Sequence, residues 1–381
     1  MLQPKLRFKN FSNNWQEKKL GDISDVRDGT HNSPKYIKNG YPLVTSKNVQ
    51  KGKIDLKNIN YISLKDFEEI NKRSKVSKGD ILMGMIGTIG NLAIVDREDF
   101  AIKNVALIKE KKELKNRMLY QILHSNIFYK KLSLLNEGGT QKFISLNNIR
   151  NLEFNIPLLE EQEKIADFLS AVDVKINLTE NKLDLFKDYK KGIMQKIFNQ
   201  ELRFKDENGN IYPMWKNKKL GELCKITTGK LDANAMVENG IYRFYTCAKE
   251  FYFINEYAFD TEALLISGNG ANVGYIHYYK GKFNAYQRTY ILDSFYENIL
   301  FIKYILEKNL KTRIEKEKNS GNTPYIVLSV LTDMELKISC LEEQQKIADF
   351  LSSIDSKIEK ISDKLENLKE FKKGLLQQMF V

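Results

Sequence analysis

The sequence predicts an α+β protein with two mixed α/β domains and two long helices. Two observations lead to this prediction: the chain repeats itself once, and each repeat ends in a stretch with the hydrophobic spacing of a coiled coil. A third observation is that short apolar stretches alternate with glycine-rich turns elsewhere, which is typical of strands. The 381 residues allow two or three domains at roughly 100–200 residues each.

The repeat is visible near the beginning and at the end of each half. Residues 15–23 return as 215–223, at an offset of 200, and residues 159–198 return as 341–380, at an offset of 182, with 22 of 40 positions identical. The region between these matches diverges, and the difference of 18 between the offsets makes it shorter in the second half. Two similar segments that frame two dissimilar ones are suited to holding interchangeable recognition domains on a fixed frame.

The repeat divides the chain into four segments and predicts a pseudo-two-fold arrangement. We expect a first variable domain at 1–158, a first long helix at 159–200, a second variable domain at 201–340 and a second long helix at 341–381. Within the variable domains, strand-like stretches such as 92–95 are followed by a stretch with helical spacing. Each half then has a glycine turn, at 138–140 and 321–323, and a strand-like stretch before its long helix.

Both long segments carry apolar residues at alternating steps of four and three, which is the a/d spacing of a coiled coil. The first seam comprises Ile165, Leu169, Val172, Ile176, Thr179, Leu183, Phe186, Lys190, Ile193 and Ile197. The second comprises Ile347, Leu351, Ile354, Ile358, Ile361, Leu365, Leu368, Lys372, Leu375 and Met379. About 32 residues at 1.5 Å each give a helix of roughly 48 Å.

We expect the two helices to pair with each other, and the spacing alone allows parallel or antiparallel packing. The alternative is a generic dimerisation coil that pairs with another chain. Lys190 and Lys372 occupy matching seam positions, where they weaken the seam locally and are suited to fixing its register.

Composition and cysteine spacing exclude several classes of protein. No run approaches the ~20 apolar residues of a membrane helix, and the first five residues lack the apolar stretch of a signal peptide, so a cytoplasmic location is expected. The cysteines Cys224, Cys247 and Cys340 stand far apart, which supports neither a disulfide framework nor a cysteine-based zinc site.

Catalytic motifs are not found in this sequence. The glycine clusters at 84–90 and 268–274 precede strand-like residues rather than a helix, so we interpret them as turns and not as phosphate loops. The chain has neither a GxxxxGK[ST] loop nor an Asn-Pro-Pro-aromatic run, and His31, His124 and His277 lack metal-ligand spacing. A binding protein without catalytic residues or a metal site is therefore predicted.

Residue types suited to nucleic-acid binding are more abundant. The first variable domain has many cations among Asn and Ser residues, which suit phosphate neutralisation, and the second has 22 of the chain's 42 aromatic residues. Asn, Gln and Arg side chains can pair with base edges. The candidate DNA-binding residues are Lys35, Lys38, Lys47, Lys51, Lys53, Lys72, Arg73, Lys75, Lys142, Arg243, Asn269, Asn272, Gln287 and Arg288, and the segment 285–290 is the first choice.

The net charge of +12 is unevenly distributed. It is +12 over 1–158, −1 over 159–200, +2 over 201–340 and −1 over 341–381. We therefore predict that the first variable domain dominates salt-dependent affinity, whereas the second relies more on shape and base-edge contacts. The nearly neutral helices are suited to docking proteins.

Together, these residues resemble the specificity (DNA-recognition) subunit of type I restriction-modification enzymes. The resemblance rests on the Trp-x4-Leu-Gly-[Asp/Glu]-[Ile/Leu] opening of each half, the Gly-Asp-Ile-Leu strand, the Leu-Glu-Glu-Gln-x-Lys-Ile-Ala boxes and the Lys-Lys-Gly-[Ile/Leu]-[Met/Leu]-Gln endings. It covers essentially all 381 residues.

The resemblance implies a non-catalytic subunit with two target recognition domains, each of which recognises half of a split double-stranded DNA sequence. Two long helices that pack antiparallel hold these domains and set the spacing. Two methylation subunits dock on the helices, with the coiled-coil residues as the frame, and bring S-adenosylmethionine. Restriction motor-nuclease subunits, with ATP and Mg²⁺, join for cleavage. No cofactor is expected in this chain itself.

Two alternatives belong to other classes of protein. One is a coiled-coil scaffold or assembly protein whose globular domains bind protein rather than DNA. The other is an enzyme that methylates or cuts DNA itself, which the missing cofactor loop and missing Asn-Pro-Pro-aromatic motif disfavour.

Overall fold

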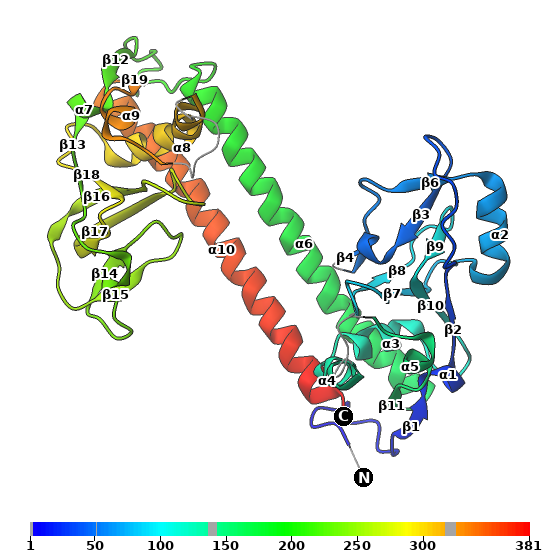
Figure 1. Cartoon of the computed structure of the whole chain (residues 1–381). Helices are drawn as coiled ribbons and strands as arrows, with labels where there is room; N and C mark the ends of the chain where they lie inside the picture. The colour runs from blue at the N-terminus through cyan, green and yellow to red at the C-terminus, as the bar shows by residue number, and fades with distance from the viewer. Residues whose placement is uncertain (1–2, 51, 136–142, 317–324) are drawn as a thin grey trace. The chain divides into compact units, whose positions relative to one another are not determined.

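A computed structural model describes residues 3–50, 52–135, 143–316 and 325–381. The chain forms two compact units, drawn in Figure 1. Unit 1 comprises Met1–Glu180 and Asp363–Val381, and unit 2 comprises Asn181–Ser362. The predicted glycine turns at 138–140 and 321–323 both lie outside the described residues.

Unit 1 contains two main sheets. The first is antiparallel with strand order β2-β10-β7-β8, and the second has the order β6-β3-β9, in which β3 pairs antiparallel with β6 and parallel with β9. The bounds are β2 (Ser24–Asp28), β10 (Val105–Glu110), β7 (Ile81–Gly84), β8 (Leu92–Ile94), β6 (Asn60–Ile62), β3 (Tyr41–Thr45) and β9 (Ala101–Lys103).

The smaller elements of unit 1 surround these sheets. They are β1 (Gln16–Lys19), α1 (Leu20–Ile23), the 3-10 helix η1 (Ser46–Asn48), β4 (Val49–Gln50), β5 (Lys53–Ile54), α2 (Leu64–Ser74), α3 (Asn116–Leu123), α4 (Asn126–Leu135), α5 (Leu146–Arg150) and β11 (Glu153–Ile156). Strand β1 pairs antiparallel with β11, so the opening motif of this half lies beside the strand that leads into the long helix. The predicted helical stretch after the sheet is α3.

Unit 2 has a single larger sheet. Its strand order is β13-β18-β16-β17-β14-β15, and β14 pairs parallel with β17 while the other neighbours are antiparallel. The strands are β13 (Lys225–Thr228), β18 (Thr289–Asp293), β16 (Phe259–Ser267), β17 (Ile276–Ala285), β14 (Tyr242–Tyr245) and β15 (Tyr252–Ile254). The other elements are β12 (Lys216–Lys219), α7 (Leu220–Leu223), the 3-10 helix η2 (Ala233–Ala235), α8 (Ile299–Lys316), α9 (Leu328–Thr332) and β19 (Glu335–Ile338).

Both glycine clusters are turns between antiparallel strands, as predicted. Residues 84–90 connect β7 to β8, and residues 268–274 connect β16 to β17. Gly90 and Gly274 have φ values of +79° and +81°, a conformation that favours glycine because a Cβ atom is disfavoured there. A Cβ on either residue would also lie 2.7 Å from a leucine or isoleucine methyl carbon of the adjacent helix.

The predicted long helices are α6 (Leu159–Phe198) and α10 (Leu341–Met379). All predicted seam residues are buried or half-buried, which confirms the heptad pattern. In unit 1, Asp173 of α6 pairs with Lys372 of α10, and Glu180 of α6 pairs with Lys369 of α10. The residue numbers of the paired positions therefore rise along α6 as they fall along α10. This places α6 and α10 antiparallel there. The four-segment domain division remains a prediction.

Each unit has a core that includes its share of the long helices. In unit 1 the sheet, α3 and α4 pack around Leu169 of α6 and Leu376 of α10. In unit 2 the sheet and α8 pack around Ile197 of α6 and Leu351 of α10. The helices are therefore part of each folded core rather than attached from outside, and burying apolar area at about 25 cal/mol per Å² favours their retention.

Candidate nucleic-acid interface

The predicted cations of the first variable domain lie on exposed segments. The residues after β2 carry Lys35 and Lys38, η1 carries Lys47, and β5 carries Lys53. The C-terminal end of α2 and the segment after it carry Lys72, Arg73, Lys75 and Lys78, and all of these side chains are exposed. Lys51 and Lys142 lie outside the described residues.

Only part of this set is neutralised by neighbouring carboxylates. Lys72 Nζ lies 2.6 Å from the Glu69 carboxylate, and Arg73 pairs with Asp28, whose side chain is buried. Exposed pairs such as Lys72–Glu69 are weak and leave the cation available to another anion. Within the described part of the chain, no ion pair is formed by Lys35, Lys38, Lys47, Lys53 or Lys75.

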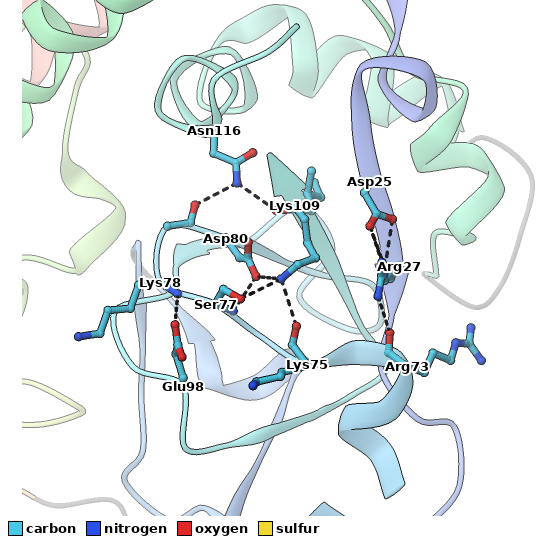
Figure 2. A network of polar contacts seen from close by, with 12 residues as sticks. Asp25, Arg27, Arg73, Lys75, Ser77, Lys78, Asp80, Glu98, Lys109 and Asn116 are labelled. Atoms are coloured by element: carbon cyan, nitrogen blue, oxygen red, sulfur yellow. Dashed lines mark hydrogen bonds and ion pairs between the residues drawn. The ribbon is translucent and has the colours of Figure 1, made fainter. Parts of the chain in front are cut away.

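The segment after α2 is fixed through its backbone, as Figure 2 shows. Lys109 Nζ of β10 donates to the Lys75 carbonyl at 3.1 Å and to Ser77 Oγ at 3.3 Å, and it also pairs with Asp80. Arg27 Nη1 donates to the Arg73 carbonyl at 3.1 Å. Because the contacts with Arg73 and Lys75 use their backbone carbonyls, the side chains of these two residues remain exposed while their Cα positions are held.

The base of this network carries its own ion pair. Arg27 binds the Asp25 carboxylate at 2.9 and 3.1 Å, and this contact holds the pKa of Asp25 below its ordinary value. Asn116, at the first residue of α3, donates through Nδ2 to the carbonyls of Gly79 and Ile108 at 3.0 and 3.2 Å. The cation-bearing segment is thereby connected to both the sheet and α3.

A polar cluster that sequence reasoning missed lies at the end of β2. His31 contacts the Asp28 carboxylate at 2.8 Å through Nε2 and the Asn104 side-chain oxygen at 2.9 Å through Nδ1. Asp28 also pairs with Arg73, so four polar side chains from three segments meet there. The sequence gives no signal for it because Asp28 and Asn104 are 76 positions apart.

In the second variable domain, three loops that carry candidate residues are joined by hydrogen bonds. The Arg288 carbonyl accepts from Gly268 N at 2.8 Å and from Cys247 Sγ at 3.4 Å. Asn272 Nδ2 donates to the Cys247 carbonyl at 3.1 Å. Asn269, half-buried in the same turn, forms an isolated bridge with Tyr325. The structure therefore places Asn269, Asn272 and Arg288 on adjoining loops.

Gln287 and Arg288 are exposed at the turn between β17 and β18. Gln287 Nε2 donates to the Asp232 carboxylate at 2.9 Å, which leaves its Oε1 and the exposed Arg288 guanidinium for other partners. This contact restricts the rotamers of Gln287 before any ligand binds. Gln287 and Arg288, in the segment predicted first for base recognition, therefore have the exposure that such contacts require.

Arg243 of β14 lies in an aromatic stack whose Phe251 belongs to the same β14–β15 loop as Cys247. Its guanidinium carbon lies 4.2 Å from the Phe251 ring centre and 4.5 Å from that of Tyr279, and Nη1 donates to Tyr245 Oη at 3.4 Å. A guanidinium held by its faces keeps N–H groups at its edge. Other exposed rings of the second variable domain are Tyr252, Phe253, Tyr257, Tyr275 and Tyr278.

A second set of residues that sequence reasoning missed connects each variable domain to its long helix. Arg7 forms two hydrogen bonds of 2.7 Å with the buried Glu161 carboxylate of α6. Arg203 does the same with the buried Glu343 of α10, at 3.1 and 2.7 Å. We call these two pairs the Arg–Glu joints. The repeated Leu-Arg-Phe-Lys segments, at 6–9 and 202–205, were the available signal.

The glutamine of each Glu-Glu-Gln box completes the joint. Gln162 Nε2 donates to the carbonyls of Glu113 and Pro157, both at 2.9 Å, and its Oε1 accepts from Lys115 N just before α3. Gln344 makes similar contacts: its Oε1 accepts from Asn298 N just before α8, and its Nε2 donates to the Ser339 carbonyl at 2.8 Å and to the Glu297 carboxylate at 2.7 Å. One buried amide in each half therefore fixes the beginning of a domain helix against the beginning of a long helix.

The coiled-coil residues proposed for partner docking are largely used inside the units. Leu169 and Leu351 are fully buried in the two cores, and Phe186 and Leu368 are half-buried. A partner would meet the outward faces of the helices rather than the seam. The docking role of the seam residues stays a prediction.

No helix in the described part of the chain has the length and apolarity needed to cross a membrane. Within the same residues, no group of three or more His, Cys, Asp and Glu side chains is placed to hold a metal ion. Cys224, Cys247 and Cys340 are free, and burial raises the pKa of Cys224 to about 12.

Two repeated α/β units on paired helices, with exposed cationic and polar loops, define a two-domain DNA-recognition protein. The model of the type I restriction modification DNA specificity domain matches the chain twice, over residues 12–186 and 213–370. The chain belongs to this family, so the resemblance seen in the sequence is confirmed. The interpretation as a scaffold that does not bind DNA finds no support.

Relatives and solved structures agree with this assignment. The EcoDI specificity subunit of Escherichia coli is 40% identical over 44% of this chain and 38% of its own length. The putative MjaX specificity subunit of Methanocaldococcus jannaschii is 27% identical over 95% of this chain and 92% of its own. The S subunit from M. genitalium has a similar fold, with a TM-score of 0.69 at 19% identity, covering 100% of this chain and 99% of that one.

Proposed function

We propose that each variable domain recognises one half of a bipartite DNA site, while α6 and α10 set the spacing between the halves. The observation that supports this most directly is the contrast between duplicated joints and divergent domains. The Arg–Glu joints and most of the glutamine contacts recur in both halves, whereas unit 1 has two sheets where unit 2 has one continuous sheet. Duplicated attachment with divergent surfaces suits two different half-sites on one frame.

The two domains bring different chemistry to DNA. Exposed lysines on a fixed backbone suit phosphate contacts, which supply affinity without sequence information. Gln287 and Arg288 bring amide and guanidinium donors, which suit adenine and guanine edges in the major groove. The first variable domain then contributes more of the salt-dependent affinity, and the second more of the base discrimination.

The chain acts as the recognition subunit of a larger complex in this proposal, without catalytic residues of its own. Methylation subunits dock on the outward faces of α6 and α10 and carry S-adenosylmethionine, and restriction subunits bring ATP and Mg²⁺. A structure with a similar fold, solved in work on complex assembly of the type I R-M system, supports assembly with other subunits (TM-score 0.54, 17% identity, 97% of this chain and 98% of that one).

The test is an exchange of residues 1–158 for the corresponding domain of a relative, in a strain that contains the methylation subunits. We expect one half of the methylated motif to change and the other half and the spacer to stay. The unexchanged chain is the control. A methylated motif that does not change after the exchange would contradict the proposal.

A further inference from the structure

One carboxylate in unit 1 connects three elements. Asp173 of α6 pairs through Oδ1 with Lys372 Nζ of α10, and its Oδ2 accepts from Gln121 Nε2 of α3 at 2.8 Å. Gln121 is 1% exposed, and the Lys372 side chain is 12% exposed. One oxygen of this carboxylate therefore binds α10, and the other binds α3 of the variable domain.

The corresponding carboxylate in unit 2 has the same arrangement. Asp355 of α10 accepts from Lys190 Nζ of α6 at 2.7 Å through Oδ1, and from Tyr304 Oη of α8 at 2.8 Å through Oδ2. Burial raises the pKa of Tyr304, so its hydroxyl remains a donor. We call Asp173 and Asp355 the junction carboxylates.

The repeat shows that this arrangement is not accidental. Asp173 and Asp355 are separated by 182 positions, and so are Lys190 and Lys372, which is the offset of the long helices. The domain helices differ, since α3 supplies an amide and α8 a phenol, yet each places a donor on the same oxygen. The contact has persisted while the residue that makes it changed.

The physical effect of the junction is to select one arrangement. A lysine in a coiled-coil seam disfavours every register that leaves it unpaired, and a partly buried ion pair contributes more to specificity than to stability. A slip of one heptad moves a helix by about 10 Å, which removes each lysine from its aspartate. Because the same carboxylate also holds α3 or α8, register and domain orientation are coupled.

We infer that Asp173 and Asp355 are positioning residues that determine which spacer length between the two DNA half-sites is accepted. This inference rests on the proposed function. One base pair changes the separation of half-sites by about 3.4 Å and their relative rotation by about 35°. A hydrogen bond tolerates a few tenths of an ångström, so a domain held by the junction discriminates such a change.

The experiment compares Asp173→Asn with Asp184→Asn, a matched change at an exposed position of α6. The full chain, assembled with its methylation subunits, is titrated with duplexes whose spacer is the natural length or one base pair longer or shorter. We expect Asp173→Asn to lower the preference for the natural spacer about tenfold while both half-sites stay the same. Asp184→Asn keeps the preference.

A charge exchange provides the rescue. In the double variant Asp173→Lys with Lys372→Asp, the ion pair is restored in reverse, and Gln121 can turn its amide so that Oε1, which has no partner among the described residues, accepts from the new lysine. We expect the spacer preference to return. A preference unchanged in Asp173→Asn, or not restored by the exchange, overturns the inference.

Two further measurements keep the result interpretable. If Asp173→Asn does not fold, the Gln121→Met variant provides the test. It removes only the hydrogen bond between α3 and Asp173 and conserves side-chain volume. A lowered preference in Gln121→Met supports the inference, and an unchanged one overturns it. The proposed function is contradicted by a different outcome, in which the complex with the unmodified chain binds no bipartite site at any spacer length.

Discussion

The two units are nearly alike where a variable domain meets the long helices and unlike where the sheet is extended. In unit 2 the ten residues of β17 form one strand, which pairs with β16 and, parallel, with β14. In unit 1 the corresponding stretch is split into β8 and β9 by residues 95–100, so β3 and β6 belong to a separate sheet. An interruption of six residues thus separates one sheet into two.

A helix accounts for most of the remaining difference. The segment between β6 and β7 has 18 residues and contains α2, whereas the segment between β15 and β16 has four. Helix α2 and its flanks carry Lys72, Arg73, Lys75 and Lys78, so part of the positive charge of unit 1 lies on a segment that unit 2 lacks. Divergence has altered the exposed surface of the domains and left their attachments unchanged.

The largest expected effect comes from breaking an attachment. Arg7→Met leaves the buried Glu161 carboxylate without its guanidinium, and we expect the free energy of unfolding to fall by about 3–5 kcal/mol. Arg203→Met should cost less, because Trp215 Nε1 still donates to Glu343 at 2.8 Å. Urea denaturation of both variants measures the difference, with Lys9→Met, at an exposed residue, as the control. Equal losses in all three would contradict the role of the joints.

A smaller effect concerns salt. Replacing Lys35 and Lys38 by alanine should make the negative slope of log K against log salt shallower by about two, since each lost phosphate contact contributes about −0.9 to it. In unit 2 the matched pair is Lys280 and Lys282, of which Lys280 pairs with Glu262 and Lys282 lies over the Tyr257 ring. We expect their removal to change the slope less. Binding measured across a salt series tests this, and equal changes would refute the division of roles.

The smallest expected effect is on pH dependence. Burial lowers the pKa of His124 in unit 1 and of His277 in unit 2. Each folded unit then disfavours the imidazolium, so the unfolded chain takes up a proton first as the pH falls through about 6.5, and stability decreases. The loss stops growing below the lowered folded pKa.

His124→Gln should flatten this decrease for unit 1 and leave that of unit 2 in place. Unfolding between pH 7.5 and 5.5 isolates the histidines, because carboxylates with a lowered pKa, such as Asp25 and Asp99, lose their contribution only below about pH 4. A decrease that stays equally steep in His124→Gln would show that this histidine is not the titrating group.

Much of the frame could be predicted from the sequence because its signals are local or repeated. Heptad spacing located α6 and α10, and strand-like residues after the glycine clusters identified them as turns. The direction of helix pairing could not be derived from spacing, since either direction buries the same seam. Asp173 lies outside the seam, among charged residues that heptad spacing assigns to the solvent-exposed face. Its contacts with Lys372 and Gln121 could therefore not be predicted from the sequence.

The joints were missed for a different reason. Arg7 and Glu161 are 154 positions apart, and an arginine near the beginning of a chain has no pattern that marks it as buried. The same limit applies to Asp232, whose contact with Gln287 spans 55 positions. Repetition was the usable signal for the joints, but no repeat marks Asp232, because the variable domains have diverged there.

The chain contains two tryptophans, and each lies in the core that holds one variable domain against the long helices. Trp15 is in the core of unit 1 beside Phe380, and Trp215 is in the core of unit 2 between Phe198 and Phe301. Their indoles differ, because Trp215 donates to a carboxylate and Trp15 Nε1 has no partner among the described residues. Each attachment therefore has its own intrinsic fluorophore, and a variant that retains one tryptophan reports by its emission whether that domain is still seated on the frame.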